Sequence, residues 1–414
     1  MPETREIVIL GGNLGGTSIA HYLLKHTIPL LERRDKTVSY HITLVTPNTH
    51  LFFKVAAPRA FINSTLIPQE KIWLPLKDGF KKYNAEKFTI LQGVAKDLDV
   101  SSKTVVVSPT SEGATTQKLQ YHSLFISTGT TSASPLWTLY PDQSLTKKAF
   151  SSFHEKLPKA KTILISGGGT VGVESAGEIA SEFKNAKITL ISGGTRVLPR
   201  ILPATSVRAQ TYLEKIHGVE VIHNVRAVSN TAGTDGSSTV VTLSDGTTKT
   251  VDLYIDATGG VPNTQFLPPS WLDESQRVIT MDNYFRVRGS SEESADARDV
   301  YVLGDIVAGS DGTLMQLDFM IPVAASSLAV DIAGGGKAPG ILGGLKQMIF
   351  SKGNDLPVQK EFKPMTATLM VPIGREGGVG QILGWQAPSF LVKLVKGNSY
   401  LLPMFEPILS GSKW

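Results

Sequence analysis

Two stretches of the chain share one hydrophobic pattern: an apolar run, a cluster of glycines, and then an apolar stretch with helical spacing. Residues 7–24 read IVILGGNLGGTSIAHYLL, and residues 163–179 read ILISGGGTVGVESAGEI. Apolar β-branched runs of this kind are typical of strands buried on both faces of a parallel sheet. The pattern therefore predicts the same strand–turn–helix unit twice in one chain.

The second stretch has the spacing G-x-G-x-x-G at Gly167, Gly169 and Gly172. In a dinucleotide-binding turn the first glycine permits the tight turn, the second lets a pyrophosphate approach the backbone, and the third lets helix and strand pack closely. The phosphates would lie over free N–H groups at the start of the helix, which begins around Thr170 and Val171.

The first stretch departs from this spacing at its middle position. Gly11 and Gly16 hold the first and third glycine positions, but Asn13 stands where the second glycine would be. Asparagine tolerates unusual backbone angles, although its side chain adds bulk where phosphate would approach. We interpret the stretch as a dinucleotide site with a local adjustment; the alternative is a purely structural strand-to-helix turn.

The strand after each turn lacks the carboxylate that usually binds ribose hydroxyls. Thr46 ends the strand that follows the first turn, and Ser192 lies twenty residues after Gly172. Because Arg196 is near Ser192, the second site would accept a 2′-phosphate, which slightly favours NADPH over NADH. The alternative is that Arg196 is only a surface charge.

The repeat extends beyond the glycine turns. Each half continues into alternating apolar and polar residues, at 88–107 and at 219–251, and this alternation predicts antiparallel strands. Each half then closes with a buried strand that ends in Thr-Gly, at Thr128-Gly129 and at Thr258-Gly259. Such an ending brings the backbone close to a nucleotide at the carboxyl edge of a sheet.

Four further residues or pairs are candidates for the cofactor sites. Asp305, after a third buried strand, is either a helix cap or an acceptor for cofactor hydroxyls. Ile321-Pro322 predicts the start of an apolar helix, since proline suits the first helical turn. Lys54 and Arg59 lie in a stretch that would border the first cofactor, with solvated loop charges as the alternative for both.

Composition narrows the chemistry. The 414 residues suffice for two or three globular domains, and the complete absence of cysteine excludes a thiolate nucleophile, a disulfide and a Cys-ligated metal site. Any redox chemistry must therefore be carried by bound cofactors. The net charge of +5 without a dense Lys/Arg cluster favours an anionic cofactor or substrate and argues against nucleic acid as a partner.

The sequence predicts a cytoplasmic protein with neither a secretory signal nor a transmembrane helix. No apolar run approaches the roughly 20 residues needed to cross a bilayer, and MPETREIVIL lacks a basic region followed by an apolar core. One segment, Phe390 to Phe405, mixes apolar residues with Lys393 and Lys396 as an interfacial helix does, which suggests peripheral membrane contact. Ordinary core packing is the alternative, and the sequence leaves monomer and homodimer open.

The order of these motifs resembles the two-dinucleotide-domain flavoprotein superfamily, which includes glutathione reductase, type II NADH dehydrogenase and apoptosis-inducing factor. Within it, the stretches AAPRAF, GVESAGEI and MVPIGREGGVGQILGW are most similar to the AMID-like and ferroptosis-suppressor branch of apoptosis-inducing-factor homologues. The resemblance implies an α/β fold with two Rossmann-like domains: an FAD domain at 1–135 and 253–345, an NAD(P)H domain at 136–252, and a small C-terminal α+β region at 346–414.

The resemblance also implies roles for single residues. Lys54 would stand beside the flavin ring and pair with Glu174, which would offset the cost of burying the lysine; the alternative is that Glu174 only stabilises its helix. Ala95 would meet the adenine, Asp305 the ribityl chain or phosphate, and the helix from Ile321 would point its N-terminus at the flavin. The predicted cofactor-binding residues are Gly11, Gly12, Asn13, Leu14, Gly16, Thr46, Lys54, Arg59, Ala95, Thr128, Gly129, Gly167, Gly169, Thr170, Val171, Gly172, Glu174, Ser192, Arg196, Gly259, Asp305, Ile321 and Pro322, with Lys54 and Glu174 as the catalytic pair.

Three functions remain open from the sequence. The favoured one is an NAD(P)H oxidoreductase that passes hydride to FAD and electrons on to a quinone-type acceptor. The others are a flavoenzyme that acts on a dedicated biosynthetic metabolite, and a flavoprotein with a mainly binding role like that of an apoptosis-inducing factor.

Overall fold

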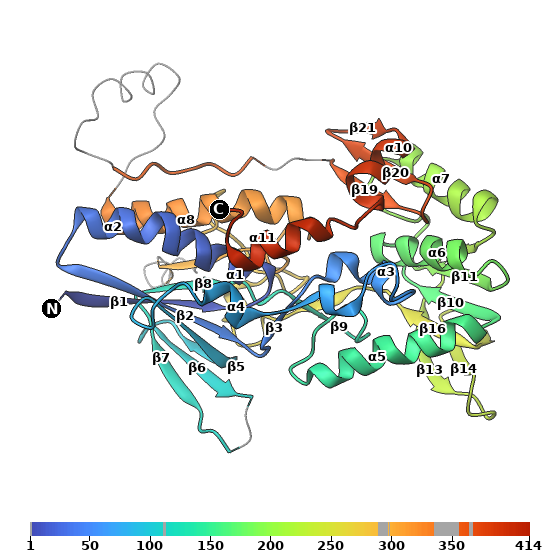
Figure 1. Ribbon diagram of the computed structural model, residues 1–414, viewed down its shortest axis with the longest axis horizontal. Helices are drawn as coiled ribbons and strands as arrows, with labels where there is room; N and C mark the ends of the chain where they lie inside the picture. The colour runs from blue at the N-terminus through green and yellow to red at the C-terminus, as the bar shows by residue number, and fades with distance from the viewer. Residues whose placement is uncertain (1, 111–112, 289–296, 298, 335–355, 364–366) are drawn as a thin grey trace.

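The computed structural model describes residues 2–110, 113–288, 297, 299–334, 356–363 and 367–414. In Figure 1 these residues form an elongated molecule, with one mainly parallel sheet in its left half and a second, fully parallel sheet in its right half. Each sheet contains one of the two glycine turns, so the arrangement has the Rossmann-like α/β character that the sequence predicts.

The first sheet has seven strands in the order β18-β8-β1-β2-β5-β6-β7. Its strands are β1 (Glu3–Leu10), β2 (Val38–Thr46), β5 (Phe88–Asp99), β6 (Thr104–Pro109), β7 (Gln117–Gln120), β8 (Ser123–Ile126) and β18 (Val300–Val302). The five strands from β18 to β5 are parallel, and β5, β6 and β7 form the predicted antiparallel meander. The helices α1 (Leu14–Tyr22), α2 (Ile28–Arg34) and α8 (Leu314–Ala333) lie along one side of this sheet (Figure 1).

The second sheet has four parallel strands in the order β12-β11-β10-β16. They are β10 (Thr162–Ser166), β11 (Lys187–Ser192), β12 (Glu220–His223) and β16 (Leu253–Asp256), and the helices α6 (Thr170–Glu182) and α7 (Pro203–Thr211) belong to the same half. An antiparallel sheet of β13 (Ala227–Ala232), β14 (Thr239–Leu243) and β15 (Thr248–Val251) follows β12.

Two details of the second half differ from the sequence predictions. The stretch 219–251 was expected to be antiparallel throughout, but β12 at its start pairs in parallel with β11. The predicted return to the first domain at residue 253 is also early, because β16 pairs with β10 through Asp256. Apolar strands of four residues carry no signal of which neighbour they pair with, so the sequence pattern alone does not assign them to a sheet.

The chain crosses between the halves at two places. The short antiparallel pair of β9 (Thr130–Ser132) and β17 (Gly260–Pro262) brings the two Thr-Gly strand ends together. Helix α5 (Gln143–Lys156) runs along the lower side of the molecule from one half to the other (Figure 1). Smaller elements of the first half are β3 (His50–Phe52), β4 (Trp73–Pro75), α3 (Ala57–Ala60) and α4 (Leu76–Phe80).

The C-terminal region packs on both halves of the molecule. The antiparallel sheet of β19 (Leu369–Pro372), β20 (Gly378–Ile382) and β21 (Trp385–Ala387), with α10 (Ser389–Val392), packs against α6 and α7. The last helix, α11 (Phe405–Ser410), returns to the first half and packs on α1 and α4 (Figure 1).

Helix α8 is the one described helix that is long and apolar enough to cross a membrane by length and composition. More than half of its apolar stretch is buried inside the protein, where it packs against α1 and β18. A core helix satisfies the same length and composition criteria, and this packing is that of a core helix.

His21 holds α11 against the first half. Its Nε2 is 2.7 Å from the carbonyl oxygen of Leu409, its Nδ1 is 3.0 Å from the hydroxyl of Tyr83, and its ring stacks on Phe80. Since a carbonyl oxygen only accepts, Nε2 carries the proton and Nδ1 accepts from Tyr83. Burial of this ring lowers the pKa of His21 to about 4.

We predict an acid-dependent loss of stability that arises from His21. Its folded-state pKa of about 4 lies below the 6.5 of an ordinary histidine, so the unfolded chain binds more protons between these values and stability falls as the pH falls. From pH 7 to pH 5 this group should cost about 2 kcal/mol of unfolding free energy. Urea unfolding of the wild type and of His21→Gln should show a smaller loss in the variant; equal losses would contradict this role.

Candidate functional site

An open cleft lies at the carboxyl end of the first sheet, where β1, β2 and β8 end. Ten of the residues predicted to bind cofactor line it: Gly11, Gly12, Asn13, Leu14, Thr46, Lys54, Ala95, Thr128, Gly129 and Asp305. They come from six separate stretches of sequence, which the parallel strands bring to one edge. This is the edge at which ligands of open α/β sheets bind.

The two glycine turns have the same geometry. Gly11 has φ +103° and Gly167 has φ +119°, angles that only glycine adopts readily. A β-carbon on Gly16 would lie 1.7 Å from the carbonyl oxygen of Gly11, and one on Gly172 would lie 1.9 Å from that of Gly167. Each helix therefore approaches its strand so closely that only glycine fits at this third position of the turn.

The middle positions of the turns differ as the sequence suggests. A β-carbon on Gly169 would meet no atom of the described residues within 4 Å, so the backbone there faces open space where a pyrophosphate could approach. In the first turn, the Asn13 amide nitrogen donates to the carbonyl oxygen of Phe52 at 3.2 Å, and its oxygen accepts from the Phe52 N–H at 3.1 Å. The extra side chain is thus held against β3.

The helices behind both turns are suited to bind an anion. Neither α1 nor α6 has a side chain that caps its first N–H groups, and neither carries an acidic residue in its first turn. By contrast, α5 is capped by Asp142 and α8 by Thr313. Unpaired N–H groups at the positive end of a helix dipole favour phosphate, so the residues present fit two dinucleotides.

Thr46 and Ser192 occupy equivalent places beneath the two turns. A β-carbon on Gly12 would lie 2.5 Å from the Thr46 β-carbon, and one on Gly168 would lie 2.5 Å from the Ser192 hydroxyl. Both residues are buried, and their hydroxyls bond within their own loops. A direct contact from either hydroxyl to a ribose stays a prediction.

Lys54 does not pair with Glu174, so that prediction is wrong. Its ammonium group lies 2.5 Å from the carboxylate of Asp305 across the cleft, and this cation lowers the pKa of Asp305. The lysine therefore lines the cleft with Asp305 as its partner, and its place beside a flavin stays a prediction.

Glu174 pairs instead with Lys396, at 2.5 Å; the Glu174 side chain is buried and that of Lys396 is 13% exposed. Burial raises the pKa of Glu174, and the charge of Lys396 only partly opposes this rise. Lys396 belongs to the C-terminal region, 222 residues further along the chain. This residue was read from the sequence as one cation of an interfacial segment, and no local signal marked it as a partner of Glu174.

Arg59 was predicted to bind cofactor, but its side chain is buried away from the cleft residues. Its guanidinium makes two hydrogen bonds to Glu178, at 2.6 and 2.8 Å, and lies over the ring of Tyr400. Tyr400 also donates to Glu178 at 3.2 Å. Arg59, Glu178, Tyr400, Glu174 and Lys396 form one buried ionic cluster that joins α3, α6 and the C-terminal region.

The prediction of a helix that begins at Ile321 is also wrong. Helix α8 begins at Leu314, so Ile321 and Pro322 lie in its interior. The hydroxyl of Thr313 caps it by accepting from the N–H of Gln316. The sequence T-x-x-Q is the capping signal that could have located this start. The first turn of α8 still lines the cleft, through Thr313 and Leu314.

The comparisons with known proteins agree with this geometry. The model of the pyridine nucleotide-disulphide oxidoreductase family matches residues 5–324. The chain belongs to this family. Membership confirms the predicted oxidoreductase class and the cofactors FAD and NAD(P)H. Because this member has no cysteine, it lacks the thiols that disulphide chemistry would need.

Relatives of the chain cover nearly its whole length. Oxidoreductase phnG of Penicillium herquei is 32% identical over 99% of this chain and 97% of its own, and oxidoreductase ptaL of Pestalotiopsis fici is 34% identical over 96% of each. Ferroptosis suppressor protein 1 of Homo sapiens is 24% identical over 95% of this chain and 92% of its own. The predicted resemblance to that branch of homologues is thereby confirmed.

Solved structures share the fold at low identity. The sulfide:quinone oxidoreductase of Aquifex aeolicus matches with a TM-score of 0.66 at 14% identity, over 98% of this chain and 92% of its own. NDH2 of Plasmodium falciparum, solved with NADH, matches with a TM-score of 0.63 at 15% identity, over 99% of this chain and 98% of its own.

Several cleft residues were not anticipated from the sequence. Asn263 joins the two Thr-Gly ends: its amide donates to the carbonyl of Thr128 at 2.9 Å and accepts from the hydroxyl of Thr131 at 2.9 Å. Other unpredicted residues of the lining include Trp137, Thr138, Leu139, Tyr140, Gln265 and Phe266. They lie in loops whose positions depend on the crossing between the halves, and no motif marks them.

We predict that two alanine substitutions in the second turn affect different properties, one mainly the stability of the protein and the other mainly nucleotide binding. Gly172→Ala places a β-carbon against a backbone oxygen and should destabilise the protein by about 3 kcal/mol. Gly169→Ala meets no atom within 4 Å in the part of the chain that the structure describes and should cost less than about 1 kcal/mol, yet it should weaken NAD(P)H binding about tenfold. Urea unfolding and nucleotide titration measure the two effects; a Gly169→Ala variant that binds NAD(P)H like the wild type would contradict the assignment.

Proposed function

We propose that this protein transfers hydride from NAD(P)H to FAD and passes the electrons to a quinone-type acceptor. The observation that carries the proposal is the pair of glycine-built helix N-termini, each without a side-chain cap, at the carboxyl ends of parallel strands in two separate sheets. One turn lines the large cleft and would hold FAD; the other would hold NAD(P)H. Correspondingly, an FAD domain would comprise the segments before α5 and after β16, and an NAD(P)H domain would lie between them.

The cleft residues would bind the flavin dinucleotide from its phosphates to its ring. The N–H groups of Leu14 and its neighbours would meet the pyrophosphate, and the backbone at Ala95 would meet the adenine. When bound, the flavin accepts a hydride from the nicotinamide and releases electrons to a second acceptor. The protein then contributes orientation and electrostatics.

Lys54 and Asp305 would supply opposite charges within this cleft. Lys54 lowers the pKa of Asp305, so the carboxylate is ionised at neutral pH and can accept from hydroxyls of the ribityl chain. The ammonium group would stabilise negative charge that develops on the ring system, and the N-terminus of α8 would add its dipole. This pairing differs from the Lys54–Glu174 pair expected from the sequence.

Glu174 and Lys396 would act as positioning residues. Their ion pair links the second turn of the NAD(P)H-binding helix to the C-terminal region. Removing one partner of a buried pair leaves an uncompensated charge, which is strongly destabilising. We therefore expect the pair to hold the two halves in the orientation that hydride transfer requires.

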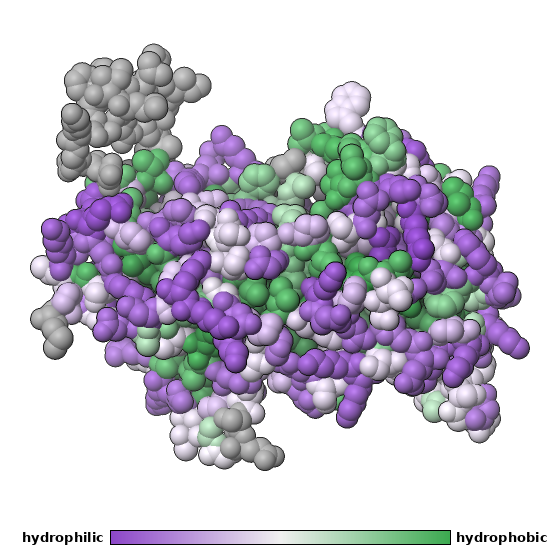
Figure 2. Space-filling view, in the orientation of Figure 1, coloured by the Kyte–Doolittle hydropathy of each residue, from purple (hydrophilic) through white to green (hydrophobic). Residues whose placement is uncertain are grey.

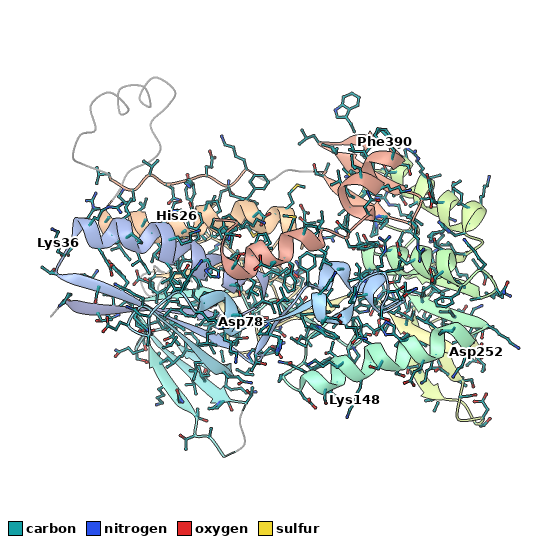
Figure 3. All side chains as sticks on the ribbon, in the orientation of Figure 1. His26, Lys36, Asp78, Lys148, Asp252 and Phe390 are labelled. Carbon is teal, nitrogen blue, oxygen red and sulfur yellow. The ribbon has the colours of Figure 1, made fainter. Side chains whose placement is uncertain are left out.

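Steady-state oxidation of NADH and NADPH with menadione and ubiquinone analogues tests this function. Wild-type protein should be yellow and turn over with quinone. Lys54→Met should retain flavin but lower kcat at least about tenfold, because a charge that stabilises the transition state is worth at least about 1.4 kcal/mol. Lys148→Met, on the exposed face of α5 (Figure 3), is the matched control and should behave as the wild type.

Two results would redirect the proposal. A flavin-loaded wild type that oxidises neither NADH nor NADPH would overturn it. Rapid reduction by NAD(P)H without turnover of any quinone would favour a flavoenzyme for a dedicated metabolite, which is consistent with the fungal relatives being named only as oxidoreductases.

An apolar acceptor would reach the protein from a membrane surface, and one exposed patch suits such contact. Trp385, Phe390 and Leu394 are 81%, 70% and 66% exposed, with Leu383 and Val395 beside them in sequence. In Figure 2 hydrophobic residues gather over β21 and α10, and Figure 3 shows Phe390 at the outer edge of this unit. The predicted segment 390–405 is thus divided, since Tyr400 and Phe405 are buried.

We predict that this patch binds lipid vesicles. Replacing Trp385, Phe390 and Leu394 together by serine should lower binding to phosphatidylcholine–phosphatidylserine vesicles at least about tenfold, since each buried apolar side chain contributes roughly 1.5–3 kcal/mol. Serine at Val228 and Met281, which are exposed elsewhere, is the control. Vesicle flotation measures both; equal binding by the two variants would contradict a role for the patch.

A further inference from the structure

A second arginine lies beside the proposed NAD(P)H site, at a place that the sequence motifs do not mark. Arg226 follows β12 and is exposed. Its side chain crosses Gly193, since a β-carbon on that glycine would lie 2.6 Å from the Arg226 Nε and 2.8 Å from its Cγ. Within the described part of the chain, no ion pair or side-chain hydrogen bond engages this guanidinium. Its N–H groups are therefore available to a ligand.

Backbone hydrogen bonds place this arginine at the carboxyl edge of the second sheet. The N–H of Val225 donates to the carbonyl of Ser192 at 3.1 Å, and the N–H of Asn224 donates to that of Gly194 at 3.1 Å. The N–H of Leu198 donates to the carbonyl of Gly168 at 2.6 Å, which holds the same loop against the glycine turn. The glycine turn, the end of β11 and Arg226 thus follow one another along one edge.

The end of β11 is where a carboxylate would select NADH. Ser192 occupies that position, so no negative charge there opposes a phosphate. Arg196, the candidate from the sequence, already donates to the carbonyl of Pro199 at 2.6 Å. It adds positive charge to the loop, but part of its guanidinium is engaged, whereas that of Arg226 is not.

We propose that Arg226 is a specificity-determining residue that binds the 2′-phosphate of NADPH. A guanidinium presents paired N–H donors that match phosphate oxygens, and its charge offsets that of the phosphate. The 2′-phosphate lies on the adenosine ribose, which the end of β11 would meet when the pyrophosphate lies over the glycine turn. The inference rests on the proposed function, because it requires a nicotinamide dinucleotide at that turn.

Titration calorimetry of the flavin-loaded protein with NADP⁺, NAD⁺ and adenosine 2′,5′-bisphosphate tests the role directly. Arg226→Gln should weaken the binding of NADP⁺ and of the bisphosphate about tenfold to a hundredfold, which is the loss expected for hydrogen bonds to a charged group. NAD⁺ binding should change less than about twofold. The NADP⁺ affinity of Arg226→Lys should lie between those of the wild type and Arg226→Gln, since lysine keeps the charge but lacks the planar, paired N–H donors of arginine.

Lys215→Gln, which removes an exposed charge from the same half, is the control and should leave the NADP⁺ affinity unchanged. Equal weakening of NADP⁺ and NAD⁺ in Arg226→Gln would mean that the arginine stacks on the adenine, and it would overturn the inference, as would no change for either. Wild-type protein that binds neither nucleotide would instead refute the proposed function.

Discussion

The close approach of helix to strand at the two glycine turns is the constraint on which the rest of the structure depends. At each turn, the space that a β-carbon of the third glycine would need is filled by the carbonyl oxygen of the first. This contact places the N-termini of α1 and α6 directly at the carboxyl edges of their sheets. Because both ends lack capping side chains, the backbone itself offers N–H groups to phosphate.

The buried ionic cluster of Arg59, Glu178, Tyr400, Glu174 and Lys396 then relates the two sheets to each other. Its acidic members belong to α6, while its cations come from α3 in the first half and from the C-terminal region. Buried ion pairs add little net stability compared with apolar packing, but each charge requires its partner. The cluster therefore specifies one arrangement of the halves.

The C-terminal region gains its role from the same cluster. It brings Lys396 and Tyr400 to the acidic residues of α6, exposes the apolar residues around Phe390, and ends in α11 against His21. The same segment thus contributes to the cluster that orients the two nucleotide sites and to the surface where an apolar acceptor would arrive.

Local sequence patterns predicted the parts of this structure that local forces determine. The glycine turns, the Thr-Gly strand ends and the cleft residues that belong to them follow from short motifs whose geometry depends on neighbouring residues. The partner of Lys54 did not follow, because Asp305 is 251 residues away and Glu174 was an equally reasonable anion. The start of α8 was missed for another reason: the apolar run with a proline outweighed the capping signal at Thr313.

The side chain of Asn13 shows why a motif departure need not abolish a site. From the sequence its bulk opposes a phosphate, but its amide is bonded at both ends to the backbone of Phe52. The strand that accepts this side chain lies outside the motif, so its effect depends on tertiary structure. The proposed role of Arg226 also depends on tertiary structure, because this residue follows β12 and the motif places the specificity-determining residue at the end of β11.

The two glycine turns would hold an electron donor and an electron acceptor in one molecule. Anaerobic mixing of the flavin-loaded protein with one equivalent of NADPH, followed by absorption spectroscopy, measures this transfer in a single turnover. The account predicts that the yellow flavin absorbance bleaches within one turnover, and that air or quinone restores it. A protein that binds flavin but keeps its full absorbance with both NADPH and NADH would contradict the account.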